Sequence, residues 1–259
     1  MLILLSPAKA LNLEPRGLDV ETTQPVLTER TRILSKTTAG LSASKLKSLM
    51  GLSEDLAQLN RERFKAFDVK SQETRPAALV FNGEVYRGLD AASMSADDFS
   101  YAQDHLRILS GLYGVLRPKD GIQPYRLEMG TRLKTRKGTN LYDFWGDDIA
   151  KALKTDLADH SQRAIVNLAS NEYSKAAKLK SIGVPVFDVD FKEEKNGQLR
   201  TLMVYAKQAR GSMARWLIDN RIEDPARLSE FDVDGYRFEP EGSTPSKLLF
   251  TRPQPAPKK

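Results

Sequence analysis

The distribution of apolar residues along the chain predicts both helices and strands. Residues 2–5 form a short, wholly apolar run, which is typical of a buried strand. Residues 26–38 repeat apolar side chains at helical spacing, and Gly40 follows them as a plausible helix stop. The same reasoning predicts further helices over residues 95–109, 142–157, 171–181 and 211–220, and strands over 77–81 and 164–168.

A β-hairpin is predicted in the second half of the chain. Residues 185–193 and 199–207 alternate apolar and polar side chains, and Asn196-Gly197 between them favours a tight turn. Because helices and strands are mixed without a regular β-α-β rhythm, we predict a single α+β domain over residues 1–252. The proline-rich segment 253–259 is expected to be a disordered tail.

The most distinctive local pattern covers residues 42–66. Two short helices, over 42–50 and 53–66, are joined by Met50-Gly51-Leu52, which predicts a helix-hairpin-helix subdomain. A glycine allows a tight turn, and the free N–H groups at the start of the second helix can then face a phosphate. The candidate DNA contacts here are Lys45, Lys47 and the backbone of Gly51, Leu52 and Ser53.

Acidic residues at the same helix start oppose this function. Glu54 and Asp55 stabilise the second helix electrostatically, but they would repel a phosphate bound at its N-terminus. Lys45 and Lys47 on the first helix could compensate for them. A purely structural pair of helices is therefore the alternative interpretation.

Composition narrows the possible functions only moderately. The 259 residues contain 40 Lys and Arg against 34 Asp and Glu, and this net charge of +6 permits a polyanionic partner without requiring one. The absence of cysteine excludes disulfides, thiolate catalysis and thiolate metal sites, and only His105 and His160 offer imidazoles. No P-loop or dinucleotide-binding glycine motif occurs, so we expect no cofactor, and no tight pattern of carboxylate ligands occurs, so we expect no metal. The apolar run at the N-terminus is too short for a signal peptide or a membrane span, which favours a cytoplasmic protein.

Positive charge is concentrated in residues 106–137. This segment contains eight Lys or Arg residues against Asp120 and Glu128, with Tyr113 and Tyr125 among them. Basic groups beside aromatic rings could hold phosphates while stacking exposed bases, although a solvated surface over buried tyrosines would give the same pattern. The candidate DNA contacts in this segment are Arg117, Lys119, Arg126, Arg132 and Lys134.

Polar side chains also lie at the ends of three predicted strands, where active sites often form. We expect a shared cleft from Lys9, Asn82, Glu84, Tyr125, Arg126 and Asn167. Lys9 could bind a phosphate, or act as an amine nucleophile if it were buried, and Glu84 or Glu172 could supply general acid–base chemistry. Taken singly, each residue is also explained by a cap, a turn or an ion pair.

Five motifs resemble the bacterial YaaA family. They occur in the family's order across nearly the whole chain: Ser6-Pro7-Ala8-Lys9, Phe81-Asn-Gly-Glu-Val-Tyr-Arg-Gly88, Ile108-Leu-Ser-Gly-Leu-Tyr-Gly-Val-Leu-Arg-Pro118, Pro124-Tyr-Arg-Leu-Glu-Met-Gly130 and Asn167-Leu-Ala-Ser170. The resemblance implies a mixed α/β fold with a helix-hairpin-helix element and DNA binding. It also implies a role in resistance to peroxide stress that is associated with lower free intracellular iron.

Three hypotheses from different classes follow. The leading one is a DNA-binding protein of the peroxide (oxidative) stress response, which contacts the backbone of duplex or distorted DNA, limits oxidative damage and needs no obligate protein partner. The alternative is an enzyme that acts on nucleic acid or damaged bases through the polar cleft. Direct iron binding ranks lowest, because it requires at least three clustered carboxylates and the sequence offers no clear set.

Overall fold

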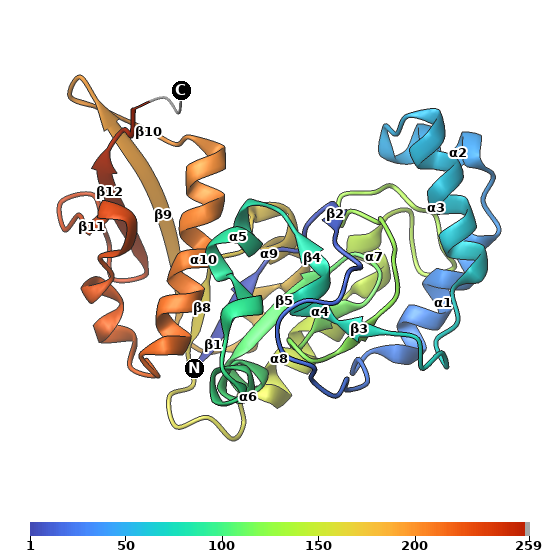
Figure 1. Cartoon of the computed structure of the whole chain (residues 1–259), viewed down its shortest axis with the longest axis horizontal. Coiled ribbons are helices and arrows are strands. Elements are labelled where there is room, and N and C mark those ends of the chain that lie inside the picture. Colours follow the sequence, from blue (N-terminus) through green and yellow to red (C-terminus); the bar gives the residue numbers. More distant parts are fainter. Residues whose placement is uncertain (257–259) are drawn as a thin grey trace.

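The central element of the protein is an eight-stranded sheet, seen in a computed structural model that describes residues 1–256 (Figure 1). Its strand order is β11-β12-β9-β8-β1-β5-β6, and β10 pairs with β9 outside this path. Five strands run parallel to their neighbours: β5 (Leu106–Ser110), β1 (Leu2–Leu5), β8 (Ile165–Asn167), β9 (Val186–Lys195) and β12 (Lys247–Pro253). Antiparallel neighbours are β6 (Gly114–Leu116), β10 (Gln198–Arg200) and β11 (Arg237–Phe238).

The apolar run at residues 2–5 forms the centre of this sheet. Every side chain of β1 is at most 1% exposed, because β5 and β8 flank the strand and helices α6 (Ala96–His105) and α10 (Met203–Asp219) contact it. Ser6 and Pro7 end β1 at its carboxyl edge. The parallel strand β8 ends at the same edge, so the segments that follow both strands begin at the carboxyl edge of the sheet.

The remaining elements surround this sheet and carry the connections between its strands. The other helices are α1 (Thr28–Ala39), α2 (Ala43–Met50), α3 (Glu54–Ala66), α4 (Ala77–Val80), α5 (Glu84–Leu89), α7 (Leu141–Trp145), α8 (Asp148–Asp156) and α9 (Asn171–Ala177). Two-residue strands pair as β2 (Ala10–Leu11) with β4 (Phe81–Asn82) and as β3 (Arg75–Pro76) with β7 (Gly121–Ile122). Short 3-10 helices complete the secondary structure at Ala91–Ser93, Leu179–Ile182, Pro225–Glu230 and Val233–Gly235.

Several predicted elements differ from the observed ones. Residues 77–81 form helix α4 and the start of β4 rather than one strand, since so short an apolar run has no decisive periodicity. The helix predicted over 95–109 ends at His105, and its apolar continuation is the central strand β5. The helix predicted over 142–157 is broken at Gly146, which adopts a positive φ of 52°. The second hairpin strand stops at Arg200, because residues from Met203 onward belong to α10.

The two helices predicted within residues 42–66 are present as α2 and α3. Figure 1 shows them with α1 at the opposite end of the molecule from β9, β11 and β12. Gly51 joins them in the left-handed region, at φ 62° and ψ 41°, and donates its N–H to the carbonyl of Lys47. Ser42 and Ser53 cap the two helices by accepting hydrogen bonds from Lys45 N and Leu56 N.

The mixed α/β class is confirmed, and the sheet is mainly parallel. The sequence does not predict this parallel arrangement, because the connections between neighbouring strands are long and irregular. For example, β1 and its neighbour β5 are separated by about a hundred residues. At the other end of the chain, β12 includes Pro253, and Gln254 N donates to Glu194 O at 2.8 Å. The predicted disordered tail therefore does not begin at Pro253, and its residues 257–259 lie outside the described part.

Candidate ligand-binding cleft

A cleft of about 540 Å³ lies at the carboxyl edge of the parallel strands. It is bounded by the segments that follow β1 and β8, by the β2–β4 region, by the loop after β7 and by α10. The pairing of Ala10 with Asn82 brings the segment after β1 beside the start of α5. The polar side chains that line the cleft are Ser6, Lys9, Asn82, Glu84, Tyr86, Tyr125, Arg126, Glu128, Ser170, Glu172, Tyr173, Lys207 and Arg210.

Five of the six residues predicted to share a cleft do line this one cavity. They are Lys9, Asn82, Glu84, Tyr125 and Arg126. The sixth, Asn167, does not line it, because its amide is used within the fold: its Nδ2 donates to Asp188 Oδ1 at 2.7 Å and its Oδ1 accepts from Ala169 N at 3.2 Å. Asn167 therefore holds the end of β8 against β9.

The basic residues at one side of the cleft are paired with acids. Lys9 Nζ lies 2.8 Å from Glu128 Oε2, and Arg126 Nη2 lies 3.3 Å from Glu128 Oε1. The Lys9 side chain is 65% exposed, so the burial on which its alternative role as an amine nucleophile depended is absent. Arg126 also keeps a buried Nε with no hydrogen-bond partner within residues 1–256.

The other two carboxylates of the cleft are also bonded. Glu84 Oε1 lies 2.7 Å from Arg87 Nη1, and Glu172 Oε1 accepts a hydrogen bond from Gly130 N at 2.8 Å. The position of Glu84 directly after a short apolar run predicts that it lines the cleft, as it does. These contacts hold both carboxylates at fixed positions on the wall of the cavity.

Three tyrosines provide neutral hydroxyl groups and apolar surface. Tyr86 donates to Ser6 O at 3.0 Å, and the hydroxyls of Tyr125 and Ser110 lie 2.6 Å apart. Burial raises the pKa of Tyr86, Tyr125 and Tyr173 above the ordinary value, so all three remain protonated at neutral pH. Tyr113 and Tyr125 are only 3% and 4% exposed, which rules out the predicted stacking of exposed bases on these rings.

Helix α10 supplies cleft residues that the sequence did not predict. Met203, Lys207 and Arg210 line the cavity and follow the spacing of one helix face. The expected strand over 199–207 concealed this periodicity. A helix assignment from Met203 onward would have placed two cations on the same face.

The basic segment divides into a structural part and an exposed part. Arg107 is buried beside Asp156, and Arg117 Nη2 lies 3.0 Å from Asp120 Oδ1, whose side chain is fully buried. Lys119 is half-buried. The exposed basic residues are Arg132, Lys134, Arg136 and Lys137, and none of these four forms an ion pair within residues 1–256.

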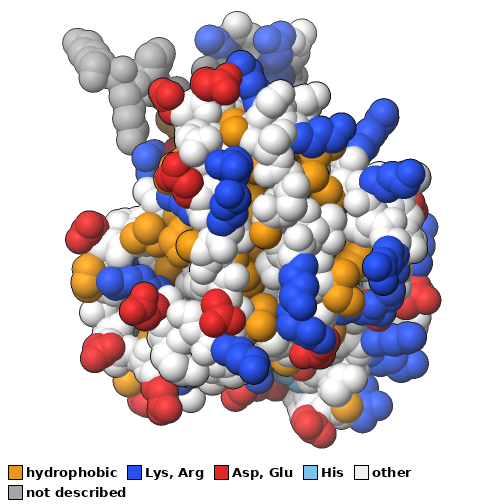
Figure 2. All heavy atoms as spheres, turned by 90° about the vertical axis from the view of Figure 1, so that its right-hand side faces the viewer, with side chains coloured by type: hydrophobic (Ala, Val, Ile, Leu, Met, Phe, Trp, Pro, Cys, Tyr) orange, Lys and Arg blue, Asp and Glu red, His pale blue; other side chains and the backbone are white. Residues whose placement is uncertain are grey.

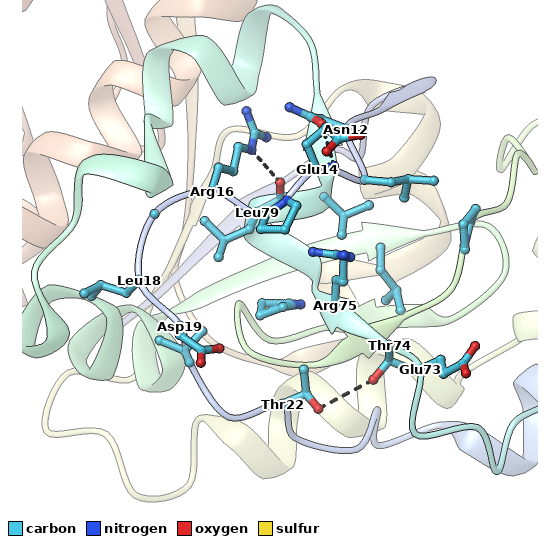
Figure 3. A pocket seen from close by; sticks show the side chains of 18 residues that line it. Asn12, Glu14, Arg16, Leu18, Asp19, Thr22, Glu73, Thr74, Arg75 and Leu79 are labelled. Carbon is cyan, nitrogen blue, oxygen red and sulfur yellow. Dashed lines mark hydrogen bonds between the residues drawn. The ribbon is translucent and has the colours of Figure 1, made fainter.

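A larger groove of about 890 Å³ lies elsewhere, between residues 12–20 and 73–80 (Figure 3). Its Arg16 donates from Nε to Leu79 O at 2.8 Å and from Nη2 to Phe81 O at 3.1 Å. This guanidinium therefore attaches the loop to the domain. The groove contains none of the residues predicted to bind or react, so the smaller cleft is the stronger candidate site.

The described residues hold neither a cluster of metal ligands nor a helix that could span a membrane. Residues 1–256 contain no group of three or more His, Asp or Glu side chains placed to hold a metal ion. Within the same range, none of the helices combines the length and the apolar character that crossing a membrane requires.

The fold and the cleft define a mixed α/β protein with a charged, tyrosine-lined cavity at the carboxyl edge of its sheet. Residues 1–242 match the family model described as "Peroxide stress protein YaaA", and the chain belongs to this family. It is 60% identical to a UPF0246 protein of Maricaulis maris over 99% of this chain and 97% of that protein. It is also 53% identical to one of Phenylobacterium zucineum (99% and 97%) and 52% identical to one of Caulobacter vibrioides (98% and 100%). Membership supports a role in the peroxide stress response.

Proposed function

We propose that this protein binds DNA, mainly through its sugar–phosphate backbone, within the peroxide stress response. The observation that carries the proposal is the exposed basic segment of Arg132, Lys134, Arg136 and Lys137, which lacks acidic partners within residues 1–256. Unpaired surface cations attract phosphates and release counterions on binding. A protein that covers DNA in this way would limit its oxidative damage without coordinating iron itself.

The molecular surface supports the proposal. Figure 2 views the side that carries α1–α3 and shows Lys and Arg side chains across much of that face, interspersed with Asp and Glu. Lys45 is exposed on α2, and no ion pair involves it within the described chain. Lys47, in contrast, is neutralised by Glu54, whose Oε2 lies 2.7 Å from Lys47 Nζ.

The α2–α3 pair would act as a secondary contact. Gly51 provides the left-handed turn that a helix-hairpin-helix element needs, and an added Cβ there would meet no atom within 4 Å, so the turn is open to a partner. The N–H of Leu56, however, already bonds to the Ser53 hydroxyl at 3.4 Å. The acidic residues Glu54 and Asp55 remain exposed beside it, and we propose that this unit supplements the basic segment.

The test is fluorescence anisotropy of a labelled duplex at several salt concentrations. Replacing the four exposed basic residues by Gln should weaken binding strongly and reduce the log–log salt slope by about 0.9 for each lost phosphate contact. A matched variant removes the same charge from exposed sites elsewhere (Lys151, Lys154, Lys180 and Lys195). Equal affinity losses in the two variants would mean that net charge, and not this segment, determines binding.

A second candidate function is an enzyme that acts on nucleic acid or damaged bases. It is favoured by the convergence of Lys9, Asn82, Glu84, Tyr125 and Arg126 on one cavity. Extrusion of a base from its stack would let such a cavity reach it. Single-stranded, duplex, bubble and junction DNA should be incubated with the protein and analysed for products. The absence of any product with all four forms would remove this candidate.

A further inference from the structure

The two cations on the α10 side of the cleft, Lys207 and Arg210, have no bonded partner in the described part of the chain. No hydrogen bond or ion pair within residues 1–256 involves the side chains of Lys207 or Arg210. The three carboxylates of the cavity do not supply partners, since Glu128 pairs with Lys9 and Arg126, Glu84 pairs with Arg87, and Glu172 accepts from Gly130 N.

Arg210 is the more unusual of the two cations. Its Nε is buried without a hydrogen-bond partner, and burial lowers the pKa of its guanidinium, while the charge of Asp190 opposes that shift. Asp190 is itself engaged by Lys247, whose Nζ lies 2.8 Å from Asp190 Oδ2. A partly desolvated guanidinium without an ion-pair partner is costly in a folded protein, and an anion bound beside it would offset that cost.

Across the cavity, Arg126 presents the same feature. Its Nε is also buried and unpartnered within the described residues, although its Nη2 contacts Glu128. Two guanidinium groups with unpartnered Nε donors therefore line a single cavity with the ammonium of Lys207, which forms no ion pair within residues 1–256. Several donors of this kind match the oxygens of a phosphate, which accepts multiple charge-assisted hydrogen bonds.

The rest of the cavity indicates what the phosphate is attached to. Met203 is 57% exposed at the start of α10, and Leu168 and Tyr86 add apolar surface. Asn82 and Glu84 supply polar groups that can pair with amino or hydroxyl groups. A cavity of about 540 Å³ lies within the range of ordinary small-molecule sites.

We propose that the cleft binds the phosphate group of a nucleotide, with Lys207 and Arg210 as its anchors. The same chemistry is offered by a free nucleotide and by the phosphorylated end of a DNA strand. The site is separate from the exposed basic segment proposed for backbone binding, because none of Arg132, Lys134, Arg136 and Lys137 lines the cleft.

Isothermal titration with AMP, adenosine and inorganic phosphate tests the anchor. AMP should bind more tightly than adenosine, and phosphate should compete with it. Lys207→Gln and Arg210→Gln should each weaken AMP binding about tenfold or more, the effect expected for losing a charged hydrogen bond. Lys154→Gln, which removes an exposed charge outside the cleft, should bind AMP as the wild type does.

Two further measurements identify which phosphorylated ligand binds and show whether a variant fails only because it misfolds. Oligothymidylate with and without a 5′-phosphate distinguishes a strand end from a free nucleotide, and tighter binding of either phosphorylated ligand supports the site. Lys207 is exposed, so its substitution tests the anchor even if Arg210→Gln fails to fold. The proposal is overturned if neither AMP nor the 5′-phosphorylated oligothymidylate binds more tightly than its unphosphorylated counterpart. It is also overturned if Lys207→Gln binds the preferred phosphorylated ligand as tightly as the wild type does. A failure of the four-residue duplex experiment would leave these results unaffected.

Discussion

Gly88 of α5 and Gly211 of α10 bring the backbones of their two helices into direct contact. A Cβ added at Gly88 would lie 2.1 Å from Gln208 O, and one added at Gly211 would lie 1.8 Å from Val85 O. No side chain fits in either place. Because α5 begins with Glu84 and α10 carries Lys207 and Arg210, this contact sets the separation of two walls of the cleft.

The first prediction concerns this helix contact. Gly211→Ala forces α5 and α10 apart, because the atoms that a Cβ would meet belong to the backbone and cannot rotate away. We expect a loss of stability of about 1–3 kcal/mol, or a fall in melting temperature of roughly 2–12 °C. Differential scanning calorimetry measures it.

The control for this substitution is Gly40→Ala. Gly40 has helical φ and ψ, and its nearest contact for an added Cβ is Thr37 O at 3.5 Å. Its melting temperature should change by no more than about 2 °C, as for an ordinary surface change. Similar losses in the two variants would show that the close packing at Gly211 is not the cause.

The second prediction concerns the start of α10. Glu193 is 1% exposed, its Oε2 accepts from Leu202 N at 3.1 Å, and Tyr236 donates to its Oε1. Arg252 Nε lies 3.7 Å from the same carboxylate. Glu193→Gln leaves Arg252 without its charge partner, and removing one member of a buried pair costs about 3–5 kcal/mol.

Urea unfolding at neutral pH checks this value. The matched control is Glu241→Gln, which removes an exposed carboxylate near β12 and should change stability by less than about 0.5 kcal/mol. A small effect of Glu193→Gln would mean that the apolar face of α10, and not this buried network, holds the helix on the sheet.

The third prediction concerns the pH dependence of stability. Hydrogen bonds from Ser95, followed by that from Arg221, lower the pKa of Asp98 from 3.8 to about 2. A carboxyl group whose pKa is depressed in the folded state stabilises the protein above its unfolded pKa. That contribution disappears as the pH falls through the folded value.

Asp98→Asn should therefore cost about 1 kcal/mol at neutral pH, because solvent screens a group near the surface, and the difference from the wild type should shrink between pH 4 and about pH 2. Urea unfolding across this range measures the difference. Asp97→Asn, one residue earlier on the same helix turn, is the control because its side chain has no bond within residues 1–256. A difference that is independent of pH would contradict the assignment.

Local sequence patterns predict those elements that are determined by their own residues and not by contacts with distant parts of the chain. The turn at Asn196-Gly197 was recognisable because both residues adopt the positive φ angles, 54° and 73°, that this dipeptide tolerates. Strand β5 cannot be predicted from such a local pattern. Its apolar residues continue the helical pattern of α6 without a break, and only pairing with distant residues, such as Ile3 with Leu106, makes them a strand.

The cleft was predictable on the side formed by strand ends and unpredictable on the other. Lys9, Asn82 and Glu84 follow short apolar runs, which was sufficient to place them together. The alternating pattern around Lys207 predicts a strand, and a strand that ends at this residue does not align it with Arg210. The sequence also could not show that Arg117 is bonded to buried Asp120, because that contact depends on how the loop folds.

The last prediction tests the role of the α2–α3 pair in the proposed DNA binding. Lys47 is held by Glu54 at 2.7 Å, and both side chains are largely exposed. Glu54→Gln frees Lys47 and removes a negative charge from the start of α3. If this turn contacts a phosphate, duplex affinity should rise a few-fold at low salt, and the log–log slope should become more negative by about 0.9.

Gly51→Asp adds a negative charge at the same turn and should have the opposite effect. Glu62→Gln, which removes the same charge farther along α3, is the control in the anisotropy assay. An equal gain from Glu54→Gln and Glu62→Gln would mean that net charge alone acts, and the α2–α3 pair would then be structural.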